Sequence, residues 1–112
     1  MAEIKLVEFV SADGTSPFGK WFDRLDAVAA AKVTTSLYRL GQGNTSNVKG
    51  IGKGIAENKI DFGPGYRVYF GWDGDVLVIL LGGGTKKSQP TDIQIAQSRW
   101  AEYKAKKKGQ KD

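Results

Sequence analysis

The 112-residue chain contains no cysteine and no histidine. The absence of cysteine removes disulfides and cysteine–zinc sites, and it fits a cytoplasmic protein. The absence of histidine excludes Ser-His-Asp triads, histidine-based zinc catalysis and the side chain that most often serves as a base near neutral pH. No cluster of carboxylates suggests a metal site either, so we expect neither a bound metal nor a cofactor.

Long apolar runs are also missing. No stretch approaches the ~20 consecutive apolar residues that a membrane-spanning helix needs, so we expect no membrane partner. The first residues, MAEIKLVEF, lack a basic segment followed by an apolar block, and we therefore expect no signal peptide. The length is right for one domain, and we expect residues 1–112 to form it.

Positive charge is in excess, with a net charge of +5 and a pI of about 9.5. The excess is concentrated at the end of the chain, since residues 99–112 hold six basic and two acidic residues. A basic surface favours a polyanion or an acidic protein as partner. A frayed, soluble tail over residues 104–112 explains the same charges equally well.

The hydrophobic pattern predicts an α+β domain in which helices cover one face of a mainly antiparallel sheet. Ser16-Pro17 and Asp26 are the expected helix starts, and Thr91 with Gln94 is read as a capping box. The expected order is an N-terminal strand over residues 3–10, a helical hairpin up to residue 40, a loop over residues 43–54, a three-stranded antiparallel meander over residues 55–61, 66–72 and 75–82, and a C-terminal helix from Thr91.

The hairpin after residue 66 divides its side chains between two faces. A two-residue turn at Asp73-Gly74 would pair Phe70 with Leu77 and Val68 with Ile79. This register predicts one core face, made of Tyr66, Val68, Phe70, Trp72, Leu77, Ile79 and Leu81.

The opposite face would be a working surface that carries Arg67 and Tyr69, with Lys59 beside Arg67. Two like charges on neighbouring strands are unfavourable by about 0.2–1 kcal/mol unless an anion lies between them, which is the main physical hint of a site. Alternatively, Glu57 neutralises the two cations and Tyr69 only covers the sheet.

Glycine and lysine residues offer a second hint of anion binding. Glycines followed by Lys86 and Lys87 at a helix N-terminus can hold phosphate, although Thr85 breaks the P-loop pattern. Lys49 and Lys53 lie in the expected loop over residues 43–54 and could also contact phosphates. In both places the alternative is that the segment only connects two elements and does not bind phosphate.

Several segments together resemble a known family. They are PFGKWFDRLD, RLGQGNTSNVKGIGKGIAE, ENKIDFGPGYRVYF and DGDVLVILLGGGTKKSQPTDIQIAQSRWAEYK, which span nearly the whole chain. The chain resembles the HigB-like, phage-derived branch of the RelE/ParE toxin superfamily, whose members are addiction-module killer proteins. One difference is Glu57-Asn58-Lys59-Ile60, where the family commonly reads E-L-R-I, so a polar Asn58 falls at a core-facing position.

The resemblance implies the toxin half of a type II toxin–antitoxin module, a small α+β fold and a cytoplasmic location. It implies a metal-independent endoribonuclease that cuts mRNA on the ribosome and inhibits translation. The implied partners are the ribosome, mRNA and a helix-turn-helix antitoxin, with DNA binding only as the toxin–antitoxin complex. The implied catalytic residues are Lys59, Arg67, Tyr69 and Lys86, and the expected RNA or phosphate contacts are Lys49, Lys53, Lys87 and Arg99.

In such a reaction the 2′-OH of the RNA is the nucleophile. Lys59 is a candidate base, Arg67 would stabilise the charge on the phosphorane, and Tyr69 could stack on a base or orient the phosphate. Lys86 or Lys87 would anchor the backbone or protonate the leaving oxygen. Two alternatives remain open, namely a ParE-type inhibitor of DNA gyrase without chemistry of its own, and a non-toxic phage-derived nucleic-acid-binding module.

Overall fold

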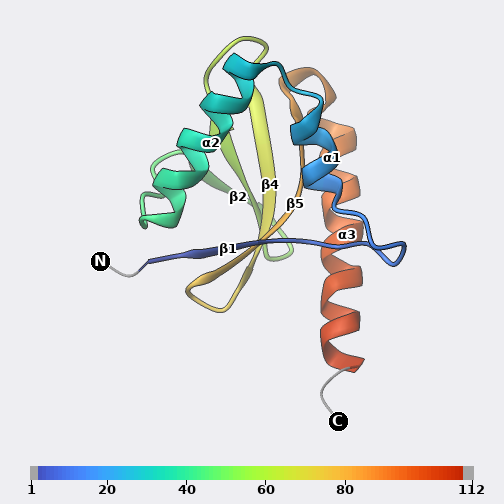
Figure 1. The fold of residues 1–112 in the computed structure, drawn as a ribbon. Helices are drawn as coiled ribbons and strands as arrows, with labels where there is room; N and C mark the ends of the chain where they lie inside the picture. The colour runs from blue at the N-terminus through green and yellow to red at the C-terminus, as the bar shows by residue number, and fades with distance from the viewer. Residues whose placement is uncertain (1–2, 110–112) are drawn as a thin grey trace.

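The computed structural model describes residues 3–109, and within them the fold is α+β with a five-stranded mixed sheet and three α-helices (Figure 1). The sheet order is β1-β5-β4-β3-β2; β1 is parallel to β5, and the other neighbours are antiparallel. The elements are β1 (Lys5–Glu8), α1 (Pro17–Asp23), α2 (Ala27–Gly41), β2 (Val48–Gly52), β3 (Ile55–Ile60), β4 (Tyr66–Asp73), β5 (Leu77–Thr85), a short 3₁₀ helix η1 (Lys86–Ser88) and α3 (Gln89–Gly109).

The two helix starts predicted near the N-terminus are confirmed. The Ser16 hydroxyl accepts a hydrogen bond from the Gly19 amide at 2.9 Å, and Pro17 begins α1. The Asp26 carboxylate accepts one from the Ala29 amide, also at 2.9 Å, and begins α2. These caps satisfy amide groups that would otherwise have no partner within the helix, which is why the helices begin there.

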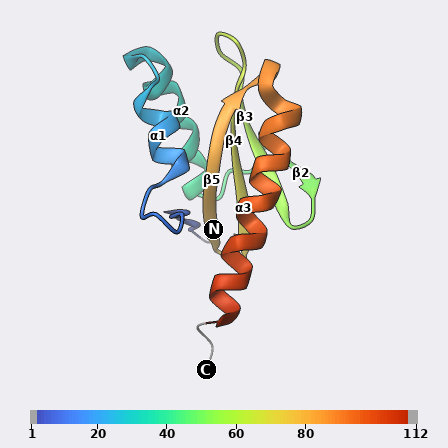
Figure 2. The same cartoon turned by 90° about the vertical axis from the view of Figure 1, so that its right-hand side faces the viewer.

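Helices cover both faces of the sheet, so the prediction that they pack on one face is wrong. Figure 2 shows α1 and α2 on one side of the sheet and α3 on the other. The first core, under α1 and α2, is centred on Val33, Leu40, Val68, Phe70, Val78 and Leu80. The second core, under α3, is centred on Tyr69, Ile79, Leu81, Ala96 and Trp100. Central strands that are apolar on both faces require cover on both.

The turn between β4 and β5 explains why the predicted face assignment is wrong in part. Asp73 pairs with Leu77, so three residues rather than two make the turn. The register therefore moves by three residues, so that Phe70 pairs with Leu80 and not with Leu77. A shift by an odd number of residues exchanges the faces of a strand, because successive side chains point to opposite faces. Val78 and Leu80 join Phe70 under α1 and α2, whereas Ile79 and Leu81 face α3.

The predicted loop over residues 43–54 contains the additional strand β2. It pairs with β3 so that Val48 lies opposite Asn58 and Lys49 lies opposite Glu57. The glycine-rich sequence has no alternation of its own, and the backbone groups at the edge of β3 supply the pairing. Asn58 faces the core as expected; it is 2% exposed and donates a hydrogen bond to the Ser36 hydroxyl at 2.7 Å.

The C-terminal helix begins at Gln89, two residues before the predicted start at Thr91. Thr85 and Ser88 form the capping box, around η1. Pro90 lies in the first turn of α3, where its missing N–H removes no helical hydrogen bond. The helix continues through Gly109, so residues 104–109 are helical; residues 110–112 of the predicted frayed tail lie outside the described residues. Within residues 3–109, no helix is long and apolar enough to cross a membrane.

Candidate functional site

Lys59 and Arg67 lie directly opposite each other on β3 and β4, as the sequence predicted. Ile60, next to Lys59, is buried in the first core, so the alternation along β3 is also confirmed. Because paired residues share a face of a sheet, the Lys59 and Arg67 side chains leave the sheet on the α3 side.

Arg67 is a buried cation held by protein oxygens. Only 6% of the residue is exposed, and its Nη1 donates a hydrogen bond to the Gly65 carbonyl at 3.1 Å. Its Nε lies 3.7 Å from Oε2 of Glu57, which is 4% exposed, and Nε has no hydrogen-bond partner among residues 3–109. The other Glu57 oxygen accepts a hydrogen bond from Gln89 Nε2 at 2.7 Å. Glu57 therefore pairs with Arg67, which was the alternative to an anion between the cations.

Three exposed lysines border this buried ion pair. Lys59 pairs with Arg67, and Lys49 reaches the same sheet face because β2 places it opposite Glu57. Lys86 follows the end of β5, and its amide donates to the Gly65 carbonyl at 2.8 Å. We call Lys49, Lys59, Arg67 and Lys86 the basic corner. Exposed lysines around a buried arginine can bind the phosphates of a polyanion.

Tyr69 is buried, so the prediction that it belongs to a surface open to RNA is wrong. It shares a face with Arg67 and pairs with Glu57, but α3 covers it and only 1% of it is exposed. Burial, and then the charges of Glu57 and Asp92, raise the pKa of the Tyr69 hydroxyl. This hydroxyl has no hydrogen-bond partner among the described residues.

The three other predicted contacts are not members of the basic corner: Lys53 and Arg99 lie away from it, and Lys87 follows Lys86 in the chain. Lys53 is in the β2–β3 turn with φ 59°, at the opposite end of β3 from Lys59. Lys87 is exposed on η1, next to Lys86 in the chain. Arg99 is on α3, and its Nη1 donates to the Leu81 carbonyl at 2.9 Å.

The sequence named Glu57 only as the alternative partner of the two cations, and it did not predict Gln89 at the site. For Glu57 the signal was its place two residues before Lys59 on the same face. Gln89 carried no local signal, because only the fold brings it to β3. Among the described side chains, no three carboxylates come together as a metal ion would require.

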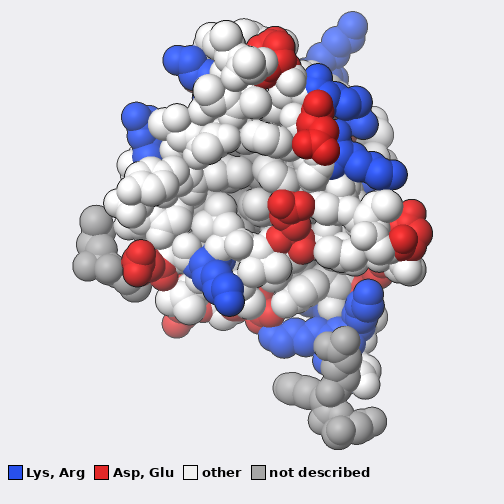
Figure 3. Space-filling model, in the orientation of Figure 1, with Lys and Arg blue, Asp and Glu red and all other residues white. Residues whose placement is uncertain are grey.

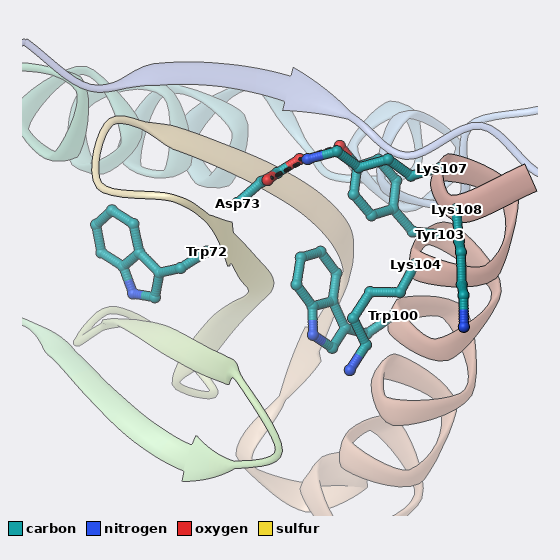
Figure 4. Close-up of a pocket in the computed structure, with 7 residues that line it drawn as sticks. All are labelled: Trp72, Asp73, Trp100, Tyr103, Lys104, Lys107 and Lys108. Carbon is teal, nitrogen blue, oxygen red and sulfur yellow. Dashed lines mark hydrogen bonds and ion pairs between the residues drawn. The ribbon is translucent and has the colours of Figure 1, made fainter. Parts of the chain in front are cut away.

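A pocket of about 320 Å³ lies at the other end of the sheet, beside the last turns of α3 (Figure 4). Trp100 and Tyr103 stack in it with ring centres 5.2 Å apart. The Asp73 carboxylate accepts a hydrogen bond from the Tyr103 hydroxyl at 2.6 Å. It also forms an ion pair with Lys107 Nζ, at 2.6 Å. Asp73 thereby connects the end of β4 to the end of α3.

We predict that Asp73→Asn frays the end of α3 and lowers the free energy of unfolding by about 1 kcal/mol, because the ion pair and part of a hydrogen bond are lost. Hydrogen exchange of the amides of residues 100–109 measures this. Asp75→Asn removes the same charge from an exposed position in the same turn and serves as the control. Equal exchange rates in the two variants would show that Asp73 does not anchor α3.

The same contact predicts a pH dependence for α3. Hydrogen bonds from Lys107 and Tyr103 lower the pKa of Asp73 below its ordinary 3.8, so its contribution is present above that pH and is lost as the pH falls through the lowered value. Burial, and then Asp73, raise the pKa of Tyr103 from 10 to about 12. The Tyr103 contribution is therefore present below pH 10 and is lost as the pH rises through 12. Exchange protection of residues 100–109 should stay level between these limits in the wild type.

These features define a small α+β protein with a buried arginine–glutamate pair under a border of lysines. No family model matches the chain. It is 43% identical over 84 residues to an uncharacterized protein of Haemophilus influenzae, in an alignment that covers 74% of this chain and 85% of that protein. The chain therefore belongs to the same family as that Haemophilus influenzae protein.

Proposed function

We propose that this protein is the toxin of a type II toxin–antitoxin module, in the HigB-like branch of the RelE/ParE superfamily, and that it cleaves mRNA on the ribosome. The observation that carries the proposal is the basic corner, in which Lys59 and Arg67 are paired in register and Lys49 and Lys86 stand on either side. The resemblance of the segments over residues 57–70 and 73–104 supports the same assignment. The arrangement of β1, the helical pair, the β3–β5 meander and α3 is compatible with a RelE/ParE-like fold.

The proposed reaction uses only side chains and the RNA. In its neutral amine form, Lys59 accepts the proton of the 2′-OH, and the 2′-oxygen attacks the adjacent phosphorus. Arg67 stabilises the charge that develops on the phosphorane, from the floor of the corner. Lys86 gives a proton to the leaving 5′-oxygen, and Lys49 and Lys87 contact neighbouring phosphates. Tyr69, which is covered by α3, orients the floor of the corner and does not stack on a base.

Glu57 adds a requirement to this scheme. In the free protein the Arg67 guanidinium is paired with Glu57 and the Gly65 carbonyl. A phosphate that reaches Arg67 competes with the Glu57 carboxylate for the same guanidinium. We therefore propose that RNA binding includes a rearrangement of this ion pair, which Gln89 stabilises in the free state.

The proposed partners are the ribosome, mRNA and a helix-turn-helix antitoxin that covers the basic corner with acidic or apolar side chains. The proposed location is the cytoplasm, where translation takes place. DNA would be bound only by the toxin–antitoxin complex.

A ParE-type inhibitor of DNA gyrase is the second candidate. The observation in its favour is the exposed lysine-rich end of α3, where Lys104, Lys106 and Lys108 project from the last turns. In that case α3 and the residues after it contact gyrase, and Lys59 and Arg67 are dispensable.

Two assays of the wild-type protein separate the candidates. In a translating extract, we expect cleavage of a reporter mRNA that stops when translation is blocked before the ribosome is loaded. In a supercoiling assay with purified gyrase, we expect no inhibition at the same concentration. Inhibited supercoiling with intact mRNA would reject the nuclease in favour of the second candidate. Induced expression without any effect on growth would reject both and favour a non-toxic nucleic-acid-binding module.

A further inference from the structure

A separate cleft of about 220 Å³ opens between α1 and α3, where both helices lie against β5. Arg24 enters it from the end of α1, Arg99 enters it from α3, and Tyr69 lines it from β4. A neighbouring hollow of about 230 Å³ is lined by the same two arginines together with Lys20. The two arginines thus converge on one place from helices that lie far apart in the sequence.

Few carboxylates balance the positive charge of the arginines at this cleft. Figure 3 shows basic side chains gathered over α1 and the facing part of α3, with acidic side chains beside them. Neither Arg24 nor Arg99 forms an ion pair with a carboxylate among residues 3–109. Asp92 also lines the cleft, but its carboxylate accepts a hydrogen bond from the Ser88 hydroxyl at 2.5 Å. Glu102 also acts on Arg99, although it does not line the cleft. The lining itself holds two guanidinium groups and one carboxylate, and this net positive charge favours an anion.

Most of the hydrogen-bond donors of Arg99 are not used by the described residues. It is half-buried, and burial lowers the pKa of its guanidinium. Of its five N–H groups, the described contacts use Nη1, which donates to the Leu81 carbonyl. Glycine at position 82 permits this approach, because a Cβ there would lie 2.7 Å from Arg99 Nη1. The remaining donors are available to a ligand in the cleft.

Tyr69 adds an independent indication of a ligand. The residue is 1% exposed, lines the cleft, and has a hydroxyl without a hydrogen-bond partner among the described residues. Buried hydroxyl groups nearly always have a partner, because leaving one unpaired loses its hydrogen bonds to water. A ligand oxygen, directly or through a water molecule, would supply that partner.

We infer that this cleft is an anion site that binds a phosphate group, held by the guanidinium groups of Arg24 and Arg99 with the Tyr69 hydroxyl at its floor. Guanidinium groups bind phosphate through paired, charge-assisted hydrogen bonds, and two of them on one anion make a specific site. The phosphate can be carried by a free nucleotide or by the backbone of RNA. This inference does not depend on the proposed nuclease activity, since the cleft shares no arginine with the basic corner.

The test follows binding to the full-length protein by NMR of the arginine Nε–H groups. Three probes are titrated separately: inorganic phosphate, a nucleoside 5′-monophosphate, and a 2′-O-methyl RNA hexamer that cannot be cleaved through its 2′-oxygen. We expect saturable shifts of the Arg24 and Arg99 signals with at least one probe. Shifts with the RNA alone would assign the phosphate to an RNA backbone, whereas shifts with the two small probes would assign it to a free phosphate or nucleotide.

Three variants locate the site. Arg24→Gln changes an exposed residue, so it should keep the fold and weaken binding about tenfold. Arg39→Gln, an exposed arginine on α2, is the matched control and should leave the affinity within about twofold. Tyr69→Phe should weaken binding while leaving the melting temperature unchanged or higher, because the hydroxyl has no partner to lose.

The same measurements can overturn the inference. It fails if none of the three probes gives saturable shifts at Arg24 and Arg99. It also fails if Arg39→Gln weakens binding as much as Arg24→Gln does, since general electrostatics would then account for the effect. An unchanged affinity in Tyr69→Phe would remove the hydroxyl from the site.

Discussion

Replacement of Arg67 by alanine is expected to abolish growth inhibition and to reduce mRNA cleavage by about 10²–10³-fold, because the cation at the floor of the basic corner is lost. The structure adds a second consequence that the sequence did not suggest. Glu57 would remain buried without its partner, and breaking a buried ion pair costs about 3–5 kcal/mol. The Arg67→Ala variant alone therefore does not distinguish a loss of catalysis from a loss of the fold.

A paired design removes this ambiguity. Glu57→Gln with Arg67→Gln makes both positions neutral while keeping polar side chains of similar size, so a protein with near-normal thermal stability and no cleavage is expected. Glu57→Gln alone should retain cleavage, since it releases Arg67 from its carboxylate. Lys5→Ala, on the exposed face of β1, controls for a general loss of positive charge. Full cleavage by the stable double variant would exclude Arg67 from the reaction.

The second large effect concerns the attachment of α3 to the sheet. Trp100 is 5% exposed and its ring lies against Gly71 of β4, where any added Cβ would overlap the ring. We expect Trp100→Ala to lower the free energy of unfolding by about 3–5 kcal/mol, as for other buried tryptophans. This is a large part of the total stability of a domain of this size. Urea denaturation followed by circular dichroism measures the change.

Gly71→Ala should also be strongly destabilising, but for the opposite reason, because it overfills the same contact. The two effects should not add: in the Trp100→Ala background the methyl group enters the space that the indole left, so Gly71→Ala should cost much less there. Tyr38→Ala, which removes an aromatic ring that is 67% exposed, should change stability by no more than about 0.5 kcal/mol. Additive costs at Gly71 and Trp100 would show that this contact does not hold α3.

The basic corner and the Arg24–Arg99 cleft lie on either side of Tyr69, which is what makes this residue informative. Its neighbours on the same sheet face are Arg67 and, across the strand, Glu57, while its ring borders the cleft with Arg99. A ligand that spans both places would contact residues from three separate segments of the chain. The arginine variants of the cleft leave the basic corner unchanged, whereas Tyr69→Phe changes a residue that borders both places.

Local sequence patterns predicted the features that depend on neighbours in the chain. Ser16 and Asp26 begin helices because a side-chain oxygen three residues before an amide caps it wherever the helix is packed. Lys59 lies opposite Arg67 because alternation along β3 and β4 and the turn at Gly63-Pro64-Gly65 are local properties. The apolar stripe with Ala96 and Trp100 likewise follows from helical spacing alone.

Tertiary structure decided which surfaces remained open. The three-residue turn after Asp73 exchanged the faces of β5, and no residue in the turn encodes that choice unambiguously. A strand that is apolar on both faces does not show which sheet face α3 will cover. Only the packing of the whole chain placed α3 over the face that carries Tyr69 and Arg67. The same packing brought Gln89 into hydrogen-bond contact with Glu57 and placed Arg24 and Arg99 in the lining of one cleft, although the residues of each pair are more than thirty positions apart. The sequence by itself determined most of the helices and strands, although not β2, and it determined which residues carry positive charge. Burial of apolar surface on both sheet faces decided which of these cations lie close together.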